Sequence, residues 1–243
     1  MVVVSITGKN RVAIITGAIG TLASELVMVA AQSGWETVLI DKDQKFLENL
    51  YDRITAAGGV EPSIHVLDFA IIEPRQCQDM VMALENSGGR LDAIVHCAVS
   101  FDGLQPLDQI APHDWVRQIQ VNLNAPWLIN FLFLPLLRQS PQASLYFLSE
   151  DLNKVAMPFW GAYGVSKHAV DTLASQLAAE LSNTNIQALS VNPGPIRSPL
   201  RARVFHTESP GRCKDAAIPA AKIMQLMDRT LKAPTTRVNL ESL

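Results

Sequence analysis

The chain has 243 residues, of which 48% are hydrophobic and 18% are charged. This length and composition can bury a large core and fit one α/β domain better than two small ones, so we expect a single domain over residues 1–243. The formal net charge is −3 and the sequence has no block of Lys and Arg residues, which argues against nucleic acid as a partner.

The cysteines and the apolar segments indicate the compartment. Cys77, Cys97 and Cys213 are odd in number, far apart and without a C-x-x-C pair, which argues against a disulfide framework or a metal site and favours a reducing compartment. The N-terminal segment "MVVVSITGKN" lacks the basic start and the cleavage pattern of a signal peptide. The longest apolar run, around "FLFLPLL", is too short to span a membrane. We therefore expect a cytoplasmic protein with no membrane partner and no bound metal.

Short apolar runs typical of β-strands alternate along the chain with segments of helical period. This alternation predicts right-handed crossovers and a mostly parallel sheet with helices on both faces, which is a doubly wound α/β fold. The clearest helix follows the fifth strand, where apolar residues recur at helical spacing from Ala162 to Leu181. The tail "TTRVNLESL" can supply a seventh strand. The other strands are predicted at residues 11–16, 36–41, 63–68, 91–98, 144–149 and 186–191.

A long irregular segment at about 192–215 is rich in Pro, Arg and Ser. Its length favours a binding loop or a lid that covers the substrate. A disordered surface segment is the alternative. Its arginines offer positive charge to an acidic substrate, although we favour their interpretation as solvated loop residues. They are Arg197, Arg201, Arg203 and Arg212.

The segment "TGAIGTLA" lies between the first strand and the helix that follows it. Gly17 permits a tight turn, Gly20 lets the backbone approach a pyrophosphate, and Ala23 suits the position where helix and strand pack. A merely structural turn is the alternative for a single glycine pattern. We predict a dinucleotide-binding loop whose cofactor-binding residues are Gly17, Gly20, Thr21 and Leu22.

Two acidic residues at strand ends extend this prediction. Asp41 ends the second strand, where its carboxylate can accept hydrogen bonds from ribose hydroxyls and repel a 2′-phosphate, so we predict NAD rather than NADP. Lys42 complicates the choice, because a neighbouring cation partly compensates a phosphate. Asp68 and Phe69, at the end of the third strand, are candidates for the adenine end of the cofactor. A helix N-cap or turn role is the alternative for Asp68.

Further motifs complete a recognisable set. Tyr163 and Lys167 stand one helical turn apart, "LDAIVHCA" covers the fourth strand, and "VNPGPIRSP" follows the sixth. Together with the glycine loop, this order and spacing resembles the short-chain dehydrogenase/reductase family over nearly the whole chain. The resemblance implies a Rossmann fold and hydride transfer between a nicotinamide and an alcohol or carbonyl carbon. It also implies that the residues near the nicotinamide and its ribose are Ala98, Pro193, Gly194 and Ile196.

The resemblance assigns proton chemistry to Tyr163, Lys167 and Asn122. Tyr163 looks like the general acid/base, and the charge of Lys167 favours the phenolate of a side chain whose ordinary pKa is near ~10. An ordinary pair at a helix surface is the alternative. Asn122 matches the asparagine whose main-chain carbonyl takes part in a proton relay. Pro126 supports this role, because it has no N–H and leaves the Asn122 carbonyl without its helical partner; a kink that serves only packing is the alternative.

Several positions depart from the family pattern. The catalytic serine of the family corresponds to Glu150, and Ser149 stands one residue early. Because strand side chains alternate between faces, we expect Ser149 to point to the wrong side unless a bulge restores it. We keep both residues as catalytic candidates. Thr21 and Ala23 stand where compact members of the family have the second and third glycines of the loop. His96, Cys97 and Val99 replace both asparagines and the glycine of the family's fourth-strand motif.

We therefore expect an NAD(P)-dependent oxidoreductase that acts on a small or medium carbonyl compound or secondary alcohol. The alternative is a cofactor-binding but catalytically silent dimer with a structural or regulatory role. We favour a slow enzyme, since an ionised Glu150 beside the phenol disfavours the phenolate; a repurposed catalytic acid is the other reading of Glu150. The stretch "WLINFLFLPLL" is more apolar than one helix face in a monomer requires, so we expect a homodimer or homotetramer, with core burial as the alternative.

Overall fold

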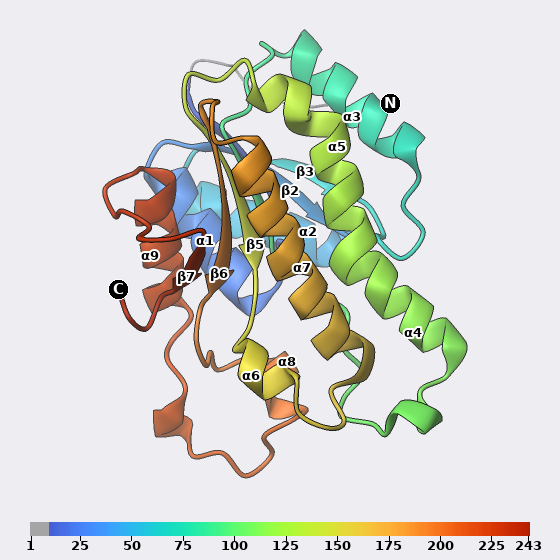
Figure 1. Cartoon of the computed structure of the whole chain (residues 1–243). Coiled ribbons are helices and arrows are strands. Elements are labelled where there is room, and N and C mark those ends of the chain that lie inside the picture. The colour runs from blue at the N-terminus through green and yellow to red at the C-terminus, as the bar shows by residue number, and fades with distance from the viewer. Residues whose placement is uncertain (1–9) are drawn as a thin grey trace.

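A parallel sheet of seven strands runs through the centre of the structure, a computed structural model that describes residues 10–243 (Figure 1). The strands are β1 (Val12–Thr16), β2 (Glu36–Asp41), β3 (Ser63–Val66), β4 (Ala93–His96), β5 (Ala143–Leu148), β6 (Ile186–Asn192) and β7 (Arg237–Asn239). Their order in the sheet is β3-β2-β1-β4-β5-β6-β7, and every neighbouring pair is parallel. The predicted doubly wound fold is thus confirmed, with its seventh strand. The segment on which the expectation about a signal peptide rests, residues 1–9, lies outside the described residues.

Helices cover both faces of the sheet (Figure 1). One face carries α1 (Thr21–Gln32), α2 (Gln44–Ala56) and α9 (Ala217–Met227), and the other carries α3 (Pro74–Asn86), α5 (Ala125–Leu137) and α7 (Gly161–Glu180). The helix α4 (Pro112–Ile119) leads towards α5. Two short helices, α6 (Leu152–Val155) and α8 (Pro199–Ala202), lie beyond the carboxyl ends of β5 and β6.

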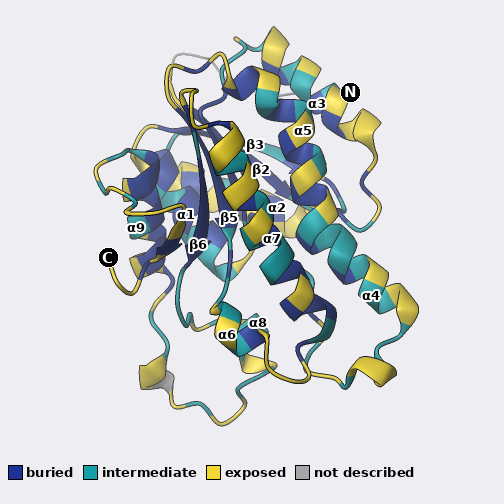
Figure 2. Cartoon of the chain, viewed as in Figure 1, coloured by how far each residue is buried: buried dark blue, intermediate teal, exposed yellow. Residues whose placement is uncertain are grey.

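The strands in the centre of the sheet are buried, as their dark blue colour in Figure 2 shows. Side chains alternate along a strand, so each strand packs against both helical layers. In β1, Val12 and Ile14 pack with the α3, α5 and α7 side, whereas Ala13 and Ile15 pack with the α1, α2 and α9 side. All four are fully buried. The carboxyl ends of the strands, where the loops begin, are therefore held by a continuous core.

The strand order reverses between β1 and β4, which opens a crevice at their carboxyl ends. The hydroxyl of Thr16 accepts hydrogen bonds from the N–H groups of Cys97 (3.2 Å) and Ala98 (3.3 Å). Gly17 has a φ of 63°, and a Cβ at this position would lie 2.6 Å from backbone atoms of Ala98. Only glycine satisfies both the left-handed conformation and this close approach. The glycine loop is thereby fixed against the end of β4.

The connection between α4 and α5 contains one π-helical turn, η2 (Gln120–Asn124). Pro126 follows it in the first turn of α5 and has no N–H to offer the preceding turn. The irregularity that Pro126 predicts is therefore present, as a π-turn, a feature often found at functional sites.

The lid segment (residues 192–215) is tied together by its own backbone. Ile196 and Lys214 form a β-bridge, and the N–H of Lys214 donates to the Pro195 carbonyl at 2.9 Å. Between these ends lie α8 and a short turn, η3 (Pro210–Arg212). The segment thus has an ordered path below the carboxyl ends of the strands in Figure 1, although its closure over a substrate stays a prediction.

No helix within residues 10–243 is long and apolar enough to cross a membrane. The same part of the chain contains no cluster of His, Cys, Asp and Glu side chains suited to a metal ion. The three cysteines are free thiols.

Candidate active site

Two adjoining cavities form one cleft over the carboxyl ends of the strands. One has a volume of about 340 Å³ and the other about 550 Å³, and both are lined by the glycine loop and by Cys97 and Val99. The larger cavity brings together the predicted residues Gly17, Gly20, Asp41, Asp68, Phe69 and Ala98. The smaller brings together Gly20, Thr21, Leu22, Ser149, Glu150, Tyr163, Lys167, Pro193, Gly194 and Ile196. Asn122 is the one predicted site residue that lines neither.

The larger cavity has the features of an adenosine site. Asp41 accepts hydrogen bonds from the N–H groups of Lys42 (2.8 Å) and Ile19 (3.4 Å), so its carboxylate links the end of β2 to the glycine loop. Burial raises the pKa of Asp41, against the opposing effect of these hydrogen bonds. Asp68 accepts from the N–H of Ala70 at 2.9 Å, which is the turn role named as its alternative. The open N-terminus of α1 at Gly20 offers unpaired backbone N–H groups to a pyrophosphate. These donors and acceptors fit a dinucleotide.

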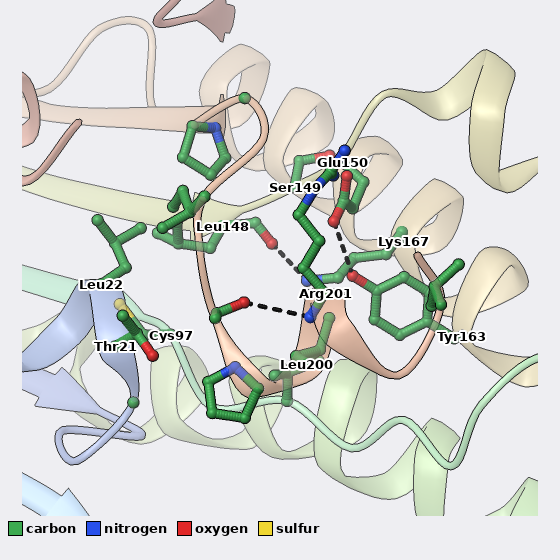
Figure 3. Close-up of a pocket in the computed structure, with 18 of the residues that line it drawn as sticks. Thr21, Leu22, Cys97, Leu148, Ser149, Glu150, Tyr163, Lys167, Leu200 and Arg201 are labelled. Carbon is green, nitrogen blue, oxygen red and sulfur yellow. Dashed lines mark hydrogen bonds between the residues drawn. The ribbon is translucent and has the colours of Figure 1, made fainter. Parts of the chain in front are cut away.

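The smaller cavity holds Tyr163 in contact with Glu150 (Figure 3). The Tyr163 hydroxyl donates to Glu150 Oε1 at 3.1 Å, and only 2% of the tyrosine is exposed. Burial, and after it the Glu150 carboxylate, raises the pKa of Tyr163 well above its ordinary value. The phenol is therefore held in its protonated form.

Lys167 stands one turn further along α7, but its ammonium group is turned to the backbone. Its Nζ donates to the Leu148 carbonyl at 2.7 Å and lies 5.5 Å from the centre of the Tyr163 ring. Burial lowers the pKa of Lys167, and the charge of Glu150 opposes that shift. Tyrosine, lysine and glutamate thus form one electrostatic unit at the end of β5.

Ser149 takes no part in this unit. Its Oγ is buried and has no hydrogen-bond partner among residues 10–243, while Glu150 reaches the phenol. This arrangement agrees with the alternation of side chains along the extended backbone. The position next to the tyrosine hydroxyl is occupied by a carboxylate rather than by a neutral hydroxyl.

Asn122 connects three elements through its side chain. Its Nδ2 donates to the Ser100 carbonyl (2.9 Å) and to Ser166 Oγ (3.0 Å), and its Oδ1 accepts from the N–H of Ser100 (2.7 Å). Ser166 lies on α7 between the tyrosine and the lysine, and its hydroxyl donates to the Tyr163 carbonyl. The side chain of Asn122 therefore holds η2 against α7, and a relay through its main-chain carbonyl stays a prediction.

The residues that replace the family's fourth-strand asparagines have different surroundings. Cys97 lines both cavities, and burial raises the pKa of its thiol to about 12 against the opposing charge of Lys167, so the thiol stays protonated. His96 lies outside the cleft, with Nε2 at 2.9 Å from Asn130 Oδ1 and its ring stacked on Phe147. Burial lowers the pKa of His96 to about 4, which makes it neutral near pH 7.

The sequence did not predict most of the residues that form the cavity wall opposite the glycine loop. Trp160 packs with Tyr163 and Phe101, with ring centres 5.8 and 5.7 Å from the Trp160 ring. The signal was present in "MPFWGAY", whose aromatic residues come directly before the tyrosine. The other residues of this wall are Lys154, Leu200, Arg201, Val204 and Phe205.

Comparison with known proteins identifies the family. A sequence model described as short chain dehydrogenase matches residues 11–209. The chain belongs to the short-chain dehydrogenase/reductase family. It is 29% identical to the uncharacterized oxidoreductase YciK of Escherichia coli (strain K12) over 209 residues, which is 86% of this chain and 82% of the relative.

Solved structures of similar proteins share the whole fold. A protein from Pseudomonas syringae described as a short chain dehydrogenase superposes with a TM-score of 0.89 at 30% identity and covers 99% of each chain. One from Escherichia coli CFT073, complexed with NADPH, gives a TM-score of 0.88 at 28% identity over 95% of this chain and 96% of its own. This chain is thus an oxidoreductase of the family by sequence and by fold. The alternative of a silent dimer receives no support from these relatives.

Proposed function

We propose that the protein transfers a hydride between a nicotinamide dinucleotide and a carbonyl compound or secondary alcohol. The observation that carries this proposal is the position of Tyr163 and Lys167 on one turn of α7, beside the cavity that the glycine loop also lines. A bound nicotinamide would supply or accept the hydride. The chain's own residues then handle the proton on the substrate oxygen.

The protonation state of Tyr163 favours the reductive direction. Since burial and Glu150 raise its pKa, the phenol carries its proton at neutral pH and can donate it to a carbonyl oxygen. In oxidation the phenol must first lose that proton, which the same surroundings oppose. Before it donates to substrate, Tyr163 has to give up its hydrogen bond to Glu150. We propose that this exchange makes the enzyme slow.

Asp41, Asp68 and Phe69, which line the larger cavity, would hold the adenosine end of the cofactor. Pro193, Gly194 and Ile196 line the nicotinamide end. The similar protein from Escherichia coli CFT073 is complexed with NADPH, which favours NADP as the cofactor. That comparison does not support the preference for NAD predicted from Asp41. We propose that Asp41 nevertheless sets the ratio of the affinities for NADP and NAD, because its charge weakens the binding of NADP relative to that of NAD.

We also propose that the chain assembles as a homodimer through α5 and α7. Trp127 (53% exposed) and Phe131 (64% exposed) stack on each other on α5, and Val165 on α7 is half exposed. Adjacent exposed aromatic side chains favour a covered surface over core burial. Light scattering at micromolar concentration measures the mass, and a monomer contradicts this proposal.

The test of the proposed function is a panel of alcohols and carbonyl compounds with each nicotinamide cofactor. We expect reduction of at least one carbonyl compound, followed by the absorbance of the reduced nicotinamide, and slower oxidation of the matching alcohol. Titration calorimetry with the cofactor alone is run beside it. Tight cofactor binding without turnover of any compound overturns the proposal.

A further inference from the structure

The cavity wall opposite the glycine loop is largely apolar. Trp160, Leu200, Val204 and Phe205 all line it. Trp160 belongs to a buried cluster with Phe101 and Tyr163, and the other three, which are lid residues, pack against that cluster. A substrate carbon bonded to the reacting oxygen at Tyr163 therefore has aromatic and aliphatic side chains for neighbours.

Arg201, one of the cations on this wall, is already paired with a carboxylate. Arg201 donates two hydrogen bonds of 2.6 Å to the two carboxylate oxygens of Glu208, and the side chains are only 16% and 14% exposed. The Cys213 thiol donates to the same carboxylate at 3.2 Å. Our expectation that the lid arginines are solvated holds for Arg197, Arg203 and Arg212, which are exposed, and is wrong for Arg201. Arg203 also donates a hydrogen bond to the Phe101 carbonyl at 2.9 Å.

Phe205 lies between the second cation of this wall, Lys154, and the pair of Arg201 and Glu208. The Lys154 ammonium lies 4.1 Å from the centre of the Phe205 ring, and the Arg201 guanidinium lies 4.5 Å from it. The hydrogen bonds from Arg201 lower the pKa of Glu208 to about 2, with a smaller contribution from the charge of Lys154, so Glu208 is ionised near neutral pH. Three cations line this cavity, Lys154, Lys167 and Arg201. Arg201 is bound by Glu208, the charge of Lys154 acts on Glu208, and Glu150 acts on Lys167. A substrate anion finds the Arg201 guanidinium already bound by Glu208 and the Lys154 ammonium over the Phe205 ring.

We propose that the substrate is an uncharged ketone or secondary alcohol with an apolar or aromatic substituent, and that Glu208 determines this specificity by occupying Arg201. The inference rests on the proposed function, since it assumes that the reacting oxygen lies at Tyr163. An aryl group gains free energy by leaving water against Trp160 and Phe205. A carboxylate on that group has to leave water and approach Glu208 and Glu150 instead.

The test compares two ketones of one shape and different charge, para-acetylbenzamide and para-acetylbenzoate. We expect kcat/KM for the amide to exceed that for the acid by at least about tenfold, because the buried acid lacks a partner. In Glu208→Gln the freed guanidinium can bind the acid, and the preference should fall by at least about tenfold. A wild-type enzyme that prefers the acid, or an unchanged preference in Glu208→Gln, overturns the proposal.

Two controls separate specificity from structural damage. In the double variant Arg201→Gln with Glu208→Gln the lid carries no free guanidinium, so the preference for the amide should return; if it does not, the exclusion is not due to Arg201. Glu180→Gln removes the same charge at an exposed position at the end of α7 and should leave the preference unchanged. Titration calorimetry of both ketones into the cofactor-loaded protein distinguishes the two proposals. Tighter binding of the amide without turnover supports this inference and contradicts the proposed function, whereas turnover with a preference for the acid does the reverse.

Discussion

The two ends of the cleft are built by different means. At the adenosine end, backbone groups do most of the positioning. Gly17 approaches the backbone of Ala98, and Asp41 accepts a hydrogen bond from one N–H group of the glycine loop, that of Ile19. At the substrate end the positions depend on side chains, with Tyr163 donating to Glu150 and Arg201 to Glu208. Backbone arrangements of the first kind tolerate many substitutions around them. At the substrate end, by contrast, replacement of a single side chain changes the charge and the hydrogen bonds of the site.

Both ends depart from the family pattern, and this contrast explains why the departures have different consequences. Thr21 and Ala23 replace glycines without closing the cleft, since Thr21 still lines the cavity and Ala23 packs into the core. One departure at the end of β5 puts the Glu150 carboxylate next to the phenol of Tyr163. The two ends can therefore be perturbed independently, and the predictions below use that independence.

The largest effect is expected from Tyr163→Phe. Loss of the phenolic proton should lower kcat by about a thousandfold, within the range of general acid–base catalysis, while the cofactor affinity stays unchanged. Steady-state rates and calorimetric titration of the cofactor measure the two quantities. Tyr51→Phe, on the distant helix α2, serves as the control. An equal loss of cofactor affinity in Tyr163→Phe contradicts the separation of the two ends.

The fold and the cofactor end could be predicted from the sequence because they depend on local rules. Alternating apolar segments give the parallel sheet, and Gly17 after a buried strand gives the turn. The pairing of Arg201 with Glu208 could not be predicted, because it depends on the path of the lid segment and not on the spacing of the two residues in the sequence. The same holds for Lys154 and Phe205, which meet only when α6 and the lid come together. The placement of Ser149 could not be settled by side-chain alternation alone, since Ser149 and Glu150 both line the smaller cavity although only Glu150 reaches the phenol.

Gly17→Ala should damage the adenosine end. A Cβ at 2.6 Å from the Ala98 backbone, at a φ of 63°, forces the glycine loop away from β4. We expect the free energy of unfolding to fall by about 2 kcal/mol and the cofactor affinity by about a hundredfold. Chemical denaturation and calorimetry measure these changes. Gly211→Ala is the matched control, because its Cβ meets no atom within 4 Å; similar losses in both variants contradict the proposed role of Gly17.

Glu150→Ser should improve the substrate end. A neutral hydroxyl removes the charge that raises the pKa of Tyr163, and the phenol no longer has to leave a carboxylate. We expect turnover at neutral pH to rise by at least about tenfold, or roughly 1.4 kcal/mol of barrier. Glu180→Gln is again the control for loss of charge. A fall in turnover identifies Glu150 as a catalytic acid.

The pH dependence gives a second test of the same variant. Oxidation needs the phenolate, so its rate should rise with pH towards the raised pKa of Tyr163, whereas reduction needs the phenol and should stay constant until that pKa is approached. Because Glu150→Ser removes one cause of the raised pKa, the rise in the oxidation rate should move to lower pH. Rates in both directions over the alkaline range measure the shift. An unmoved profile means that Glu150 does not act on Tyr163.

The smallest effect is expected from Asp41→Asn, which tests the adenosine end without altering its backbone. The amide keeps an oxygen for the N–H groups of Lys42 and Ile19 but loses the negative charge. Repulsion between that charge and a 2′-phosphate in a solvated site is about 1 kcal/mol, so the affinity for NADP relative to NAD should rise by about fivefold. Titration of wild type and variant with both cofactors gives the ratio, and Asp43→Asn, at the N-cap of α2, controls for loss of charge close by. Low salt should enlarge the difference, since screening weakens it. If the ratio of affinities does not change, Lys42 and not Asp41 distinguishes the two cofactors. Replacement of Lys42 by Gln should then weaken the binding of NADP and leave the binding of NAD unaffected.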